Sequence, residues 1–280
     1  MPSISCIIVN YNKEAFLRQA ILSVINQTMP VAEVIVADDA STDGSRELIT
    51  ALAHEYSQIK PIFREKNLGV GANRDLAIRA AESELITYLD GDDWYSPQKI
   101  EKEFLAQQGY ADAIAYSDIQ VVRHENELIW YWDTSGFPNH DVKQRLQWLV
   151  TLPGPAPRDM LVPKKLYLEA GGIQHGKNLH EDWDYQLRLA AYPNPWVHSG
   201  IVGVNYRLTD SGLAKTNSLS AHVQAQARIL MSNHKLLTEQ IGVHNFWWAM
   251  AQVYWRGTRS ALGIRSKLRK IKTYLSSDKI

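Results

Sequence analysis

Cysteine, net charge and long apolar runs are all scarce in this chain of 280 residues. The single cysteine, Cys6, excludes an internal disulfide and favours a reducing compartment. Thirty basic and thirty acidic residues cancel, so no overall field attracts nucleic acid or an anionic membrane. At the N-terminus only Ile4–Val9 is apolar, which is too short for a signal peptide or a membrane-spanning helix. We therefore expect a cytoplasmic protein that binds no nucleic acid.

Hydrophobic residues make up 45% of the chain, which is enough for one large or two small domains with a proper core. Nine tryptophans and thirteen tyrosines are many for this length, and they crowd toward the second half. This enrichment indicates a ligand cleft or an interface there, although core packing is the commoner fate of aromatic residues.

Short apolar runs alternate with segments of helical spacing in the first part of the chain. Strands are predicted at Ile4–Val9, Glu33–Ala37, Lys60–Arg64 and Leu85–Leu89, and helices at Lys13–Gln27, Ser45–Tyr56 and Gly71–Ala81. Such alternation predicts an α/β fold with a mostly parallel central sheet flanked by helices, as in Rossmann-like proteins.

Polar residues follow three of these strands, in the stretches Asn10-Tyr11, Asp38-Asp39 and Asp90–Asp93. The carboxyl ends of parallel strands lie along one edge, so these stretches would share the crevice where ligands of such sheets bind. Neighbouring carboxylates repel one another unless a cation or hydrogen-bond donors lie between them. Hard divalent ions take one or two carboxylates together with substrate phosphates. The alternatives are an Asp-Gly turn and helix-capping acids.

Each polar group then has a chemical use. Tyr11 would stack on a planar ring, or else pack at the sheet edge. Asp39 would accept hydrogen bonds from a nucleobase N–H or a ribose hydroxyl, while Asp90 and Asp92 would hold the ribose and the metal. For Asp38, a structural or capping role is as good an interpretation as ligand contact.

A glycine-rich stretch, Gly69–Arg74, runs into the third predicted helix and matches half of a dinucleotide fingerprint. Arg74 stands where the third glycine belongs, and the stretch follows the third strand, which argues against a Rossmann dehydrogenase. Arg74 would reach a phosphate, or serve as a salt-bridged helix residue. The sequence contains no Walker phosphate loop.

The second half continues with strands and helices. Strands are predicted at Ala111–Tyr116, Ile119–Arg123, Glu127–Trp132 and Trp196–Tyr206, with the second and third of these forming a hairpin. Helices are predicted from after Pro97 to about Gln108, at Val142–Val150 and at Ser218–Thr238. The proline-rich stretch Pro153–Arg158 is irregular and is expected to line a pocket.

An acidic stretch begins another predicted helix at Glu181 or Asp182. Acids at a helix start often serve only as caps. A carboxylate in a crevice can instead take a proton from a hydroxyl as a general base. Asp182 would then perform the chemistry while Glu181 or Asp184 orients the loop.

The C-terminal segment His244–Leu275 is apolar, aromatic and basic, and no acid occurs between Glu239 and Asp278. Helices of this composition can lie on an anionic membrane surface. A solvated basic face on a packed helix is the alternative.

Five stretches in this order resemble the family 2 inverting glycosyltransferases of GT-A fold. They are Ile7–Asn12, Glu33–Ser45, Asn67–Gly69, Tyr88–Pro97, and Glu181-Asp182 with Leu187-Arg188. The resemblance covers about residues 4 to 207. It implies a glycosyltransferase domain over residues 1–217, with a donor half to about 97 and an acceptor half beyond it, and a helical extension over 218–280.

What the resemblance implies about the site can be stated by residue. The donor is a nucleotide-sugar, usually with UDP, contacted by Val9, Tyr11, Asp38, Asp39, Asn67, Arg74, Asp90 and Gly91. The cofactor is a divalent metal, Mn²⁺ or Mg²⁺, with Asp92 and Asp90 as ligands. Asp182 is the base, and Glu181, Trp183 and Trp94 surround the acceptor and sugar. The stretch Pro153–Arg158 and Trp183 would shape the sugar pocket. Because the Gln-x-x-Arg-Trp residues of processive members are absent, the transfer of a single sugar is expected.

The acceptor expected by analogy is a glycan or glycolipid of a bacterial surface polysaccharide or lipopolysaccharide, with the protein at the inner face of the membrane. A sugar nucleotidyltransferase is an alternative, but its glycine-rich loop should follow the first strand, where Asn10-Tyr11-Asn12 stands. A glycoside hydrolase also uses paired acids, without a nucleotide. A non-catalytic sugar-nucleotide or glycan-binding module is the third alternative.

Overall fold

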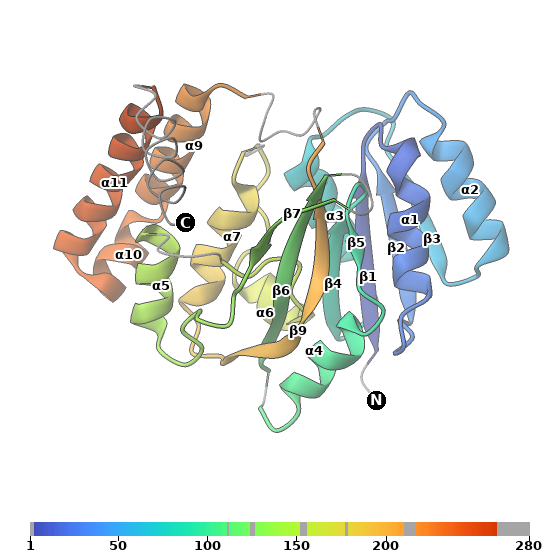
Figure 1. The fold of residues 1–280 in the computed structure, drawn as a ribbon, viewed down its shortest axis with the longest axis horizontal. Coiled ribbons are helices and arrows are strands. Elements are labelled where there is room, and N and C mark those ends of the chain that lie inside the picture. The colour runs from blue at the N-terminus through green and yellow to red at the C-terminus, as the bar shows by residue number, and fades with distance from the viewer. Residues whose placement is uncertain are drawn as a thin grey trace, which may run out of the picture. The chain divides into compact units, whose positions relative to one another are not determined.

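Strand β1 (Ile4–Asn10) lies within the first sheet, and every one of its residues is buried. Strand β2 (Glu33–Asp38) pairs with it in parallel on one side and β4 (Leu85–Asp90) on the other, while β3 (Ile59–Phe63) lies outside β2. Strand β8 (Val162–Pro163) adds to β4 in the antiparallel direction. The predicted mostly parallel sheet is confirmed (Figure 1).

The computed structural model describes residues 3–110, 112–123, 127–151, 156–176, 179–209 and 217–261, with side chains as far as Arg256. The chain divides into two compact units, Met1–Thr209 and Asp210–Ile280. The expected domain limits at residues 97 and 217 stay a prediction. Pro153 to Pro155 of the expected sugar pocket, and the basic residues after Ala261, lie outside the described residues.

Helices cover both faces of the first sheet. Helix α1 (Glu14–Ile25) connects β1 to β2, and α2 (Ser45–Glu55) connects β2 to β3, so both connections run toward one edge of the sheet. Helix α3 (Val70–Ala80) connects β3 back to β4 on the other side of β1. Right-handed crossovers therefore place α3 on the face opposite α1 and α2 (Figure 1). Apolar residues at helical spacing explain the packing of α1, since Leu17, Ala20, Ile21 and Val24 are all buried.

A second sheet, which the sequence did not predict as separate, has the order β5-β9-β6-β7. It consists of β5 (Trp94–Tyr95), β9 (Trp196–Arg207), β6 (Ile114–Arg123) and β7 (Glu127–Trp132). The predicted hairpin of β6 and β7 is confirmed, because the two strands pair in the antiparallel direction. The predicted break between Tyr116 and Ile119 is wrong: Ser117 and Asp118 are buried residues of one continuous strand, whose register to β9 shifts there.

Helices α4 (Lys99–Gln107), α5 (Val142–Thr151), α6 (Lys164–Glu169) and α7 (Glu181–Ala190) complete the first unit. The sequence did not predict α6, nor the two-residue strands β5 and β8, because segments this short carry no period. Cys6 lies within β1 with no exposed surface, and burial raises the pKa of its thiol to about 12.

The second unit contains α9 (Leu219–Ser232), α10 (His234–Ile241) and α11 (Val243–Ala261). The prediction of one helix over Ser218–Thr238 is wrong, because Asn233 ends α9 with both its backbone N–H and its side-chain amide donating to the carbonyl of Ile229. Among the helices that the structure describes, none combines the length and apolarity needed to cross a membrane.

Helix α11 has two different faces. Phe246, Ala249 and Val253 are buried on one face. On the other, large aromatic side chains are between 52% and 59% exposed: Trp247, Trp248, Tyr254 and Trp255. The helix is therefore amphipathic, with an exposed face that is aromatic.

A buried ion pair lies between α4 and the two sheets. Lys99 Nζ contacts Glu103 Oε2 at 2.6 Å, and neither side chain has exposed surface. Ser117 of β6 donates to the other carboxylate oxygen at 2.6 Å, and Lys99 Nζ lies 4.3 Å from the Tyr95 ring centroid. Both contacts join α4 to strands of the second sheet, and Lys99 Nζ also donates to Thr87 Oγ1 of β4, in the first sheet, at 3.3 Å.

We predict that Lys99→Met lowers the free energy of unfolding by about 3–5 kcal/mol, because it leaves the Glu103 carboxylate buried without its cation. Urea denaturation followed by circular dichroism measures this change. The double variant Lys99→Met/Glu103→Leu should recover most of the loss, and Lys102→Met on the same helix should stay within about 0.5 kcal/mol of the parent. Equal losses in the single and double variants would contradict the prediction.

Candidate functional site

The polar ends of β1, β2 and β4 meet where the strand order reverses. Strand β1 has β2 on one side and β4 on the other, with Asn10 opposite Asp38 and Val9 opposite Asp90. This is the switch point at which open α/β sheets bind ligands. The backbone after β4 stays close to β1 at Gly91. A Cβ at this position would lie only 3.0 Å from Asn10 Oδ1 and 3.1 Å from the Val9 carbonyl oxygen, which favours glycine there.

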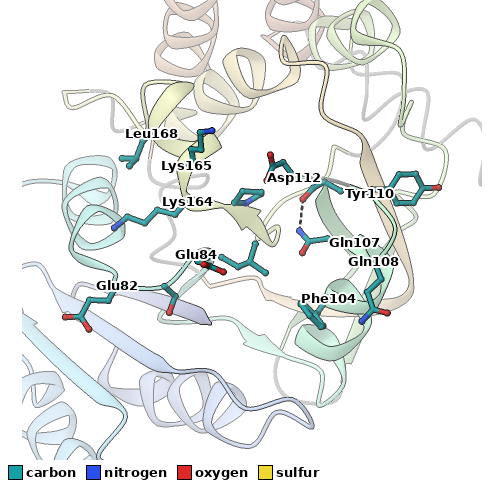
Figure 2. A pocket seen from close by; sticks show the side chains of 14 residues that line it. Glu82, Glu84, Phe104, Gln107, Gln108, Tyr110, Asp112, Lys164, Lys165 and Leu168 are labelled. Carbon is teal, nitrogen blue, oxygen red and sulfur yellow. Dashed lines mark hydrogen bonds between the residues drawn. The ribbon is translucent and has the colours of Figure 1, made fainter. Parts of the chain in front are cut away.

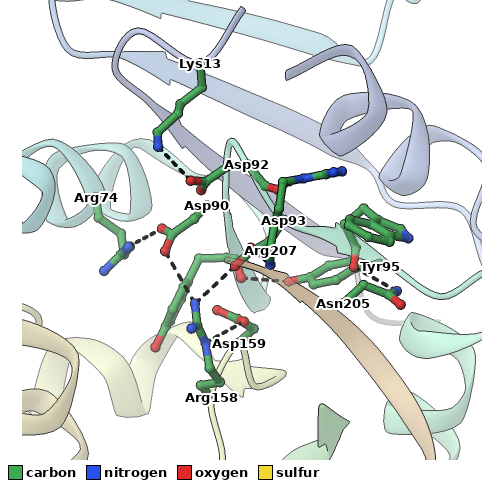
Figure 3. Close-up of polar contacts among 12 residues, drawn as sticks. Lys13, Arg74, Asp90, Asp92, Asp93, Tyr95, Arg158, Asp159, Asn205 and Arg207 are labelled. Carbon is green, nitrogen blue, oxygen red and sulfur yellow. Dashed lines mark hydrogen bonds and ion pairs between the residues drawn. The ribbon is translucent and has the colours of Figure 1, made fainter. Parts of the chain in front are cut away.

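Cationic side chains hold the acids that follow β4 (Figure 3). Lys13 Nζ contacts Asp92 Oδ2 at 2.7 Å. Arg74 pairs with Asp90 Oδ1, and Arg158 Nη2 lies 3.3 Å from Asp90 Oδ2. These pairs lower the pKa of Asp90 although its burial alone would raise it. Asp90 and Asp92 therefore each face at least one basic side chain.

Asp93 lies deeper than its neighbours and is 1% exposed. It accepts a hydrogen bond from the Arg207 backbone N–H at 2.8 Å, and Arg158 Nη2 lies 3.4 Å away. Burial, followed by repulsion from Asp92 and Asp90, raises its pKa well above the usual range. Asp93 thus ties the acidic stretch to the end of β9.

Trp94 stacks under Arg207, whose guanidinium carbon lies 4.6 Å from the indole centroid. The Arg207 Nε also donates to the Asp92 carbonyl oxygen at 3.0 Å. The expected contact between Trp94 and a sugar stays a prediction.

Asp38 and Asp39 both make contacts within the protein. Asp38 accepts from Asn10 Nδ2 at 2.8 Å and from Arg46 Nε at 3.0 Å, and it has no exposed surface. Asp39 accepts from the backbone N–H groups of Leu68 and Gly69 at 2.8 and 2.9 Å. These bonds fit the structural interpretation of Asp38, and they show that Asp39 holds the loop before α3.

Tyr11 and Asn67 lie on the solvent side of this edge. Tyr11 is 47% exposed. Asn67 is exposed too, and its Oδ1 accepts from the Gly69 N–H at 3.0 Å. The Tyr11 ring is therefore accessible to a planar ligand. Contacts of Tyr11 and Asn67 with a nucleotide stay predictions.

Arg74 connects the acidic stretch to α7. Its Nη1 contacts Glu181 Oε1 at 2.7 Å while its Nη2 contacts Asp90. The half-buried Asp182 follows Glu181 directly in the first turn of α7, next to the carboxylate that Arg74 joins to Asp90. The structure therefore brings Asp182 to the crevice that holds Asp90.

Glu181 is itself largely buried at the start of α7. Burial raises the pKa of its carboxyl to about 7, although the Arg74 charge acts in the opposite direction. Trp183 turns away from the exposed edge, since it is 8% exposed and its Nε1 donates to the Leu149 carbonyl of α5 at 2.9 Å. A sugar contact by Trp183 stays a prediction.

The donor set at Asp92 tests whether the implied divalent metal fits. No group of three or more His, Cys, Asp or Glu side chains able to hold a metal occurs in the part of the chain that the structure describes. Both oxygens of Asp90 contact arginines, whereas Asp92 contacts Lys13 through Oδ2. Mg²⁺ is commonly held by one or two carboxylates plus substrate phosphates. The residues thus fit a metal with Asp92 as its protein ligand, completed by a diphosphate.

Three residues of this cluster were missed by reasoning from the sequence: Lys13, Arg158 and Arg207. Lys13 precedes α1, Arg158 belongs to the irregular proline-rich stretch, and Arg207 ends β9. The signal that could have found them is charge balance, because an acidic crevice requires cations. Lys13 and Arg207 also stand at the ends of a predicted helix and a predicted strand.

A cavity lies at the other end of β4 (Figure 2). Its volume is about 680 Å³, and its lining includes Glu84, Leu85, Tyr110, Pro163 and Lys164. Leu85 begins the strand that Asp90 ends, so the cavity is separated from the acids by the length of β4. None of the site residues expected from the sequence lines it.

Residues 5–161 match the profile of the family described as Glycosyl transferase family 2. An uncharacterized glycosyltransferase of Haemophilus influenzae is 40% identical over 103 residues, which are 37% of this chain and 41% of the relative. The cholesterol galactosyltransferase of Borreliella burgdorferi is 42% identical over 90 residues, or 32% of this chain and 25% of the relative. The chain thus spans less than half the length of these curated relatives.

Solved structures share the fold. Residues 1–349 of S. aureus TarS superpose with a TM-score of 0.69 at 17% identity, covering 92% of this chain and 73% of TarS 1–349. The same TarS fragment in complex with UDP-GlcNAc gives a TM-score of 0.65 at 18% identity, covering 82% and 66%. The expected GT-A fold is thereby confirmed.

We predict that Glu181 makes the free energy of unfolding depend on pH. Between pH of about 4.5 and about 7, the native state retains a proton that the unfolded chain has released. The free energy of unfolding therefore falls as pH rises through this window, relative to a Glu181→Gln variant that cannot titrate. Urea titrations at several pH values measure the difference. The exposed Glu65→Gln control should follow the parent, and a difference that is flat or rises with pH would refute the assignment.

Proposed function

Because the chain belongs to glycosyl transferase family 2, we propose that it transfers one sugar from a nucleotide-sugar donor to a hydroxyl of a glycan or glycolipid acceptor. The donor proposed is a UDP-sugar. The observation that carries the proposal is the ion-pair chain from Asp90 through Arg74 to Glu181, which joins the acidic stretch to the helix of Asp182. Donor chemistry and acceptor chemistry thus have residues in one crevice.

Asp182 acts in this proposal as the general base. Its carboxylate takes the proton from the acceptor hydroxyl as that oxygen attacks the anomeric carbon, and the nucleoside diphosphate departs from the opposite face. One displacement inverts the anomeric centre. Asp182 is only half-buried in the first turn of α7, between the buried Glu181 and Trp183, which leaves it accessible to an acceptor and supports this role.

Cations beside the acidic stretch would meet the leaving diphosphate. Lys13 and Arg158 are 19% and 17% exposed and lie against Asp92 and Asp90. Fixed positive groups of this kind stabilise charge that develops in the transition state. A divalent metal held by Asp92 would supply Lewis-acid stabilisation of the same diphosphate charge.

The donor side would be formed by Tyr11, Asp39 and the loop that Asp39 holds. The exposed Tyr11 ring supports stacking on a uracil base, and the TarS complexes with UDP-GlcNAc and UDP support a UDP donor by fold analogy. A Bacillus subtilis protein named as a candidate teichuronic acid biosynthesis glycosyltransferase, TuaG, is 31% identical over 112 residues, and supports synthesis of a bacterial surface polysaccharide.

We predict that Asp182→Asn lowers kcat by at least about 100-fold, because general-base catalysis contributes roughly 10²–10⁴-fold. Release of nucleoside diphosphate from a panel of UDP-sugars with Mn²⁺ and glycan acceptors measures kcat, and calorimetry measures donor affinity, which should not change.

Asp112→Asn serves as the matched control for that substitution. Asp112 is exposed and has a φ of 53°, a conformation that asparagine tolerates, and it lies outside the proposed site. Its kcat should equal that of the parent. Loss of donor binding in Asp182→Asn with kcat otherwise retained would remove Asp182 from the role of base.

Peripheral contact with the cytoplasmic face of a membrane belongs to the same proposal. The aromatic face of α11 carries Trp247, Trp248, Tyr254 and Trp255, and tryptophan and tyrosine favour the membrane–water interface. The sequence after Glu239 adds basic residues without an acid as far as Asp278, which favours anionic lipid. A lipid-linked acceptor would then lie in the surface to which the enzyme binds.

We predict that the protein sediments with vesicles containing phosphatidylglycerol, and that Trp247→Ser/Trp248→Ser weakens this binding at least about tenfold, since fully burying a large apolar side chain contributes roughly 1.5–3 kcal/mol. The control is Trp130→Ser on β7, another exposed tryptophan, which should bind as the parent does. Binding that survives the double substitution would contradict a membrane role for α11.

A further inference from the structure

Arg74 occupies an unusual position in the crevice. It lies in the second turn of α3, its side chain is 4% exposed, and its guanidinium carbon stands 5.1 Å from the Tyr88 ring centroid. A buried arginine retains its charge only where acids compensate it. The compensating acids are Asp90 and Glu181, each in an ion pair with Arg74.

The two partners belong to opposite sides of the proposed reaction. Asp90 ends β4 and lies two residues before the proposed metal ligand Asp92. Glu181 begins α7 and lies directly before the proposed base Asp182. They are separated from Arg74 by 16 and 107 residues of chain, so the guanidinium joins segments that nothing in the local sequence connects.

The planar fork of arginine suits this task. Nη2 contacts Asp90 and Nη1 contacts Glu181, so one rigid group fixes the direction between two carboxylates. Lysine offers a single point charge and cannot set that direction. Both terminal nitrogens face protein carboxylates, which leaves them engaged before any donor phosphate arrives.

We propose that Arg74 is a positioning residue that fixes the start of α7 to the end of β4 and thereby holds Asp182 in line with a donor bound at the acidic stretch. This inference rests on the proposed function for its catalytic consequence. If Arg74 positions Asp182, its substitution lowers kcat. If Arg74 instead contacted the donor phosphate, its substitution would weaken donor binding.

The kinetic test compares Arg74→Lys and Glu181→Gln with the parent. Each should lower kcat by about 100-fold, because a displacement of about 1 Å at a catalytic group can cost that much. The Kd for UDP with Mn²⁺, measured by calorimetry, should change by less than about threefold. The double variant should lose little more than either single variant, since both remove one linkage.

Arg79→Lys is the matched control. Arg79 lies on the same helix, forms an ion pair with Asp75 at 2.8 Å and is 46% exposed. Its kcat and UDP affinity should equal those of the parent. A large rise in the UDP Kd of Arg74→Lys at unchanged kcat would overturn the proposal and make Arg74 a donor ligand.

A second measurement does not require turnover. The Asp184 amide donates to the His180 carbonyl at 3.0 Å in the first turn of α7. Its hydrogen exchange should accelerate at least about tenfold in Arg74→Lys and Glu181→Gln, because the turn opens more readily without its anchor. Accelerated exchange in a protein that transfers no sugar would support the anchoring and refute the proposed function. Exchange equal to that of the parent in both variants would overturn the anchoring itself.

Discussion

Charge compensation is the constraint on which the candidate site depends. Four carboxylates gather around the end of β4, those of Asp90, Asp92, Asp93 and Glu181, and the last two are almost fully buried. Buried charges of one sign cost several kcal/mol each unless partners compensate them. The partners are Lys13, Arg74 and Arg158. They come from three distant segments, so the site forms only when the whole first unit has folded.

The sequence allowed much of this architecture to be predicted, because periodicity and strand ends are local signals. The first four strands, their parallel pairing and the meeting of Asn10, Asp38 and Asp90 follow from the alternation of elements alone. The second sheet was not predictable in the same way, because its shortest strand, Trp94–Tyr95, has no period to detect. The division of the C-terminal helices at Asn233 depends on a side-chain bond that spacing does not reveal.

Within the site, which residues take part could be predicted better than which partners they contact. Carboxylates after strands indicate a crevice, but their partners depend on the tertiary fold: Asp39 binds the loop before α3, and Arg74 binds two acids. The family match ends at residue 161, before Glu181 and Asp182. The inclusion of α7 in the site therefore rests on the ion pair of Glu181 with Arg74, which is a property of this fold.

The seclusion of Cys6 in β1 has a practical consequence for studying motion in this enzyme. A thiol without exposed surface and with a raised pKa reacts slowly with maleimides, since the thiolate is the reactive form. A cysteine introduced at any exposed position would consequently be the one thiol that takes up a fluorophore from the medium. Two such cysteines, one on α3 and one on α7, would carry a dye pair that reports the distance between these helices in single molecules, with the native sequence otherwise intact.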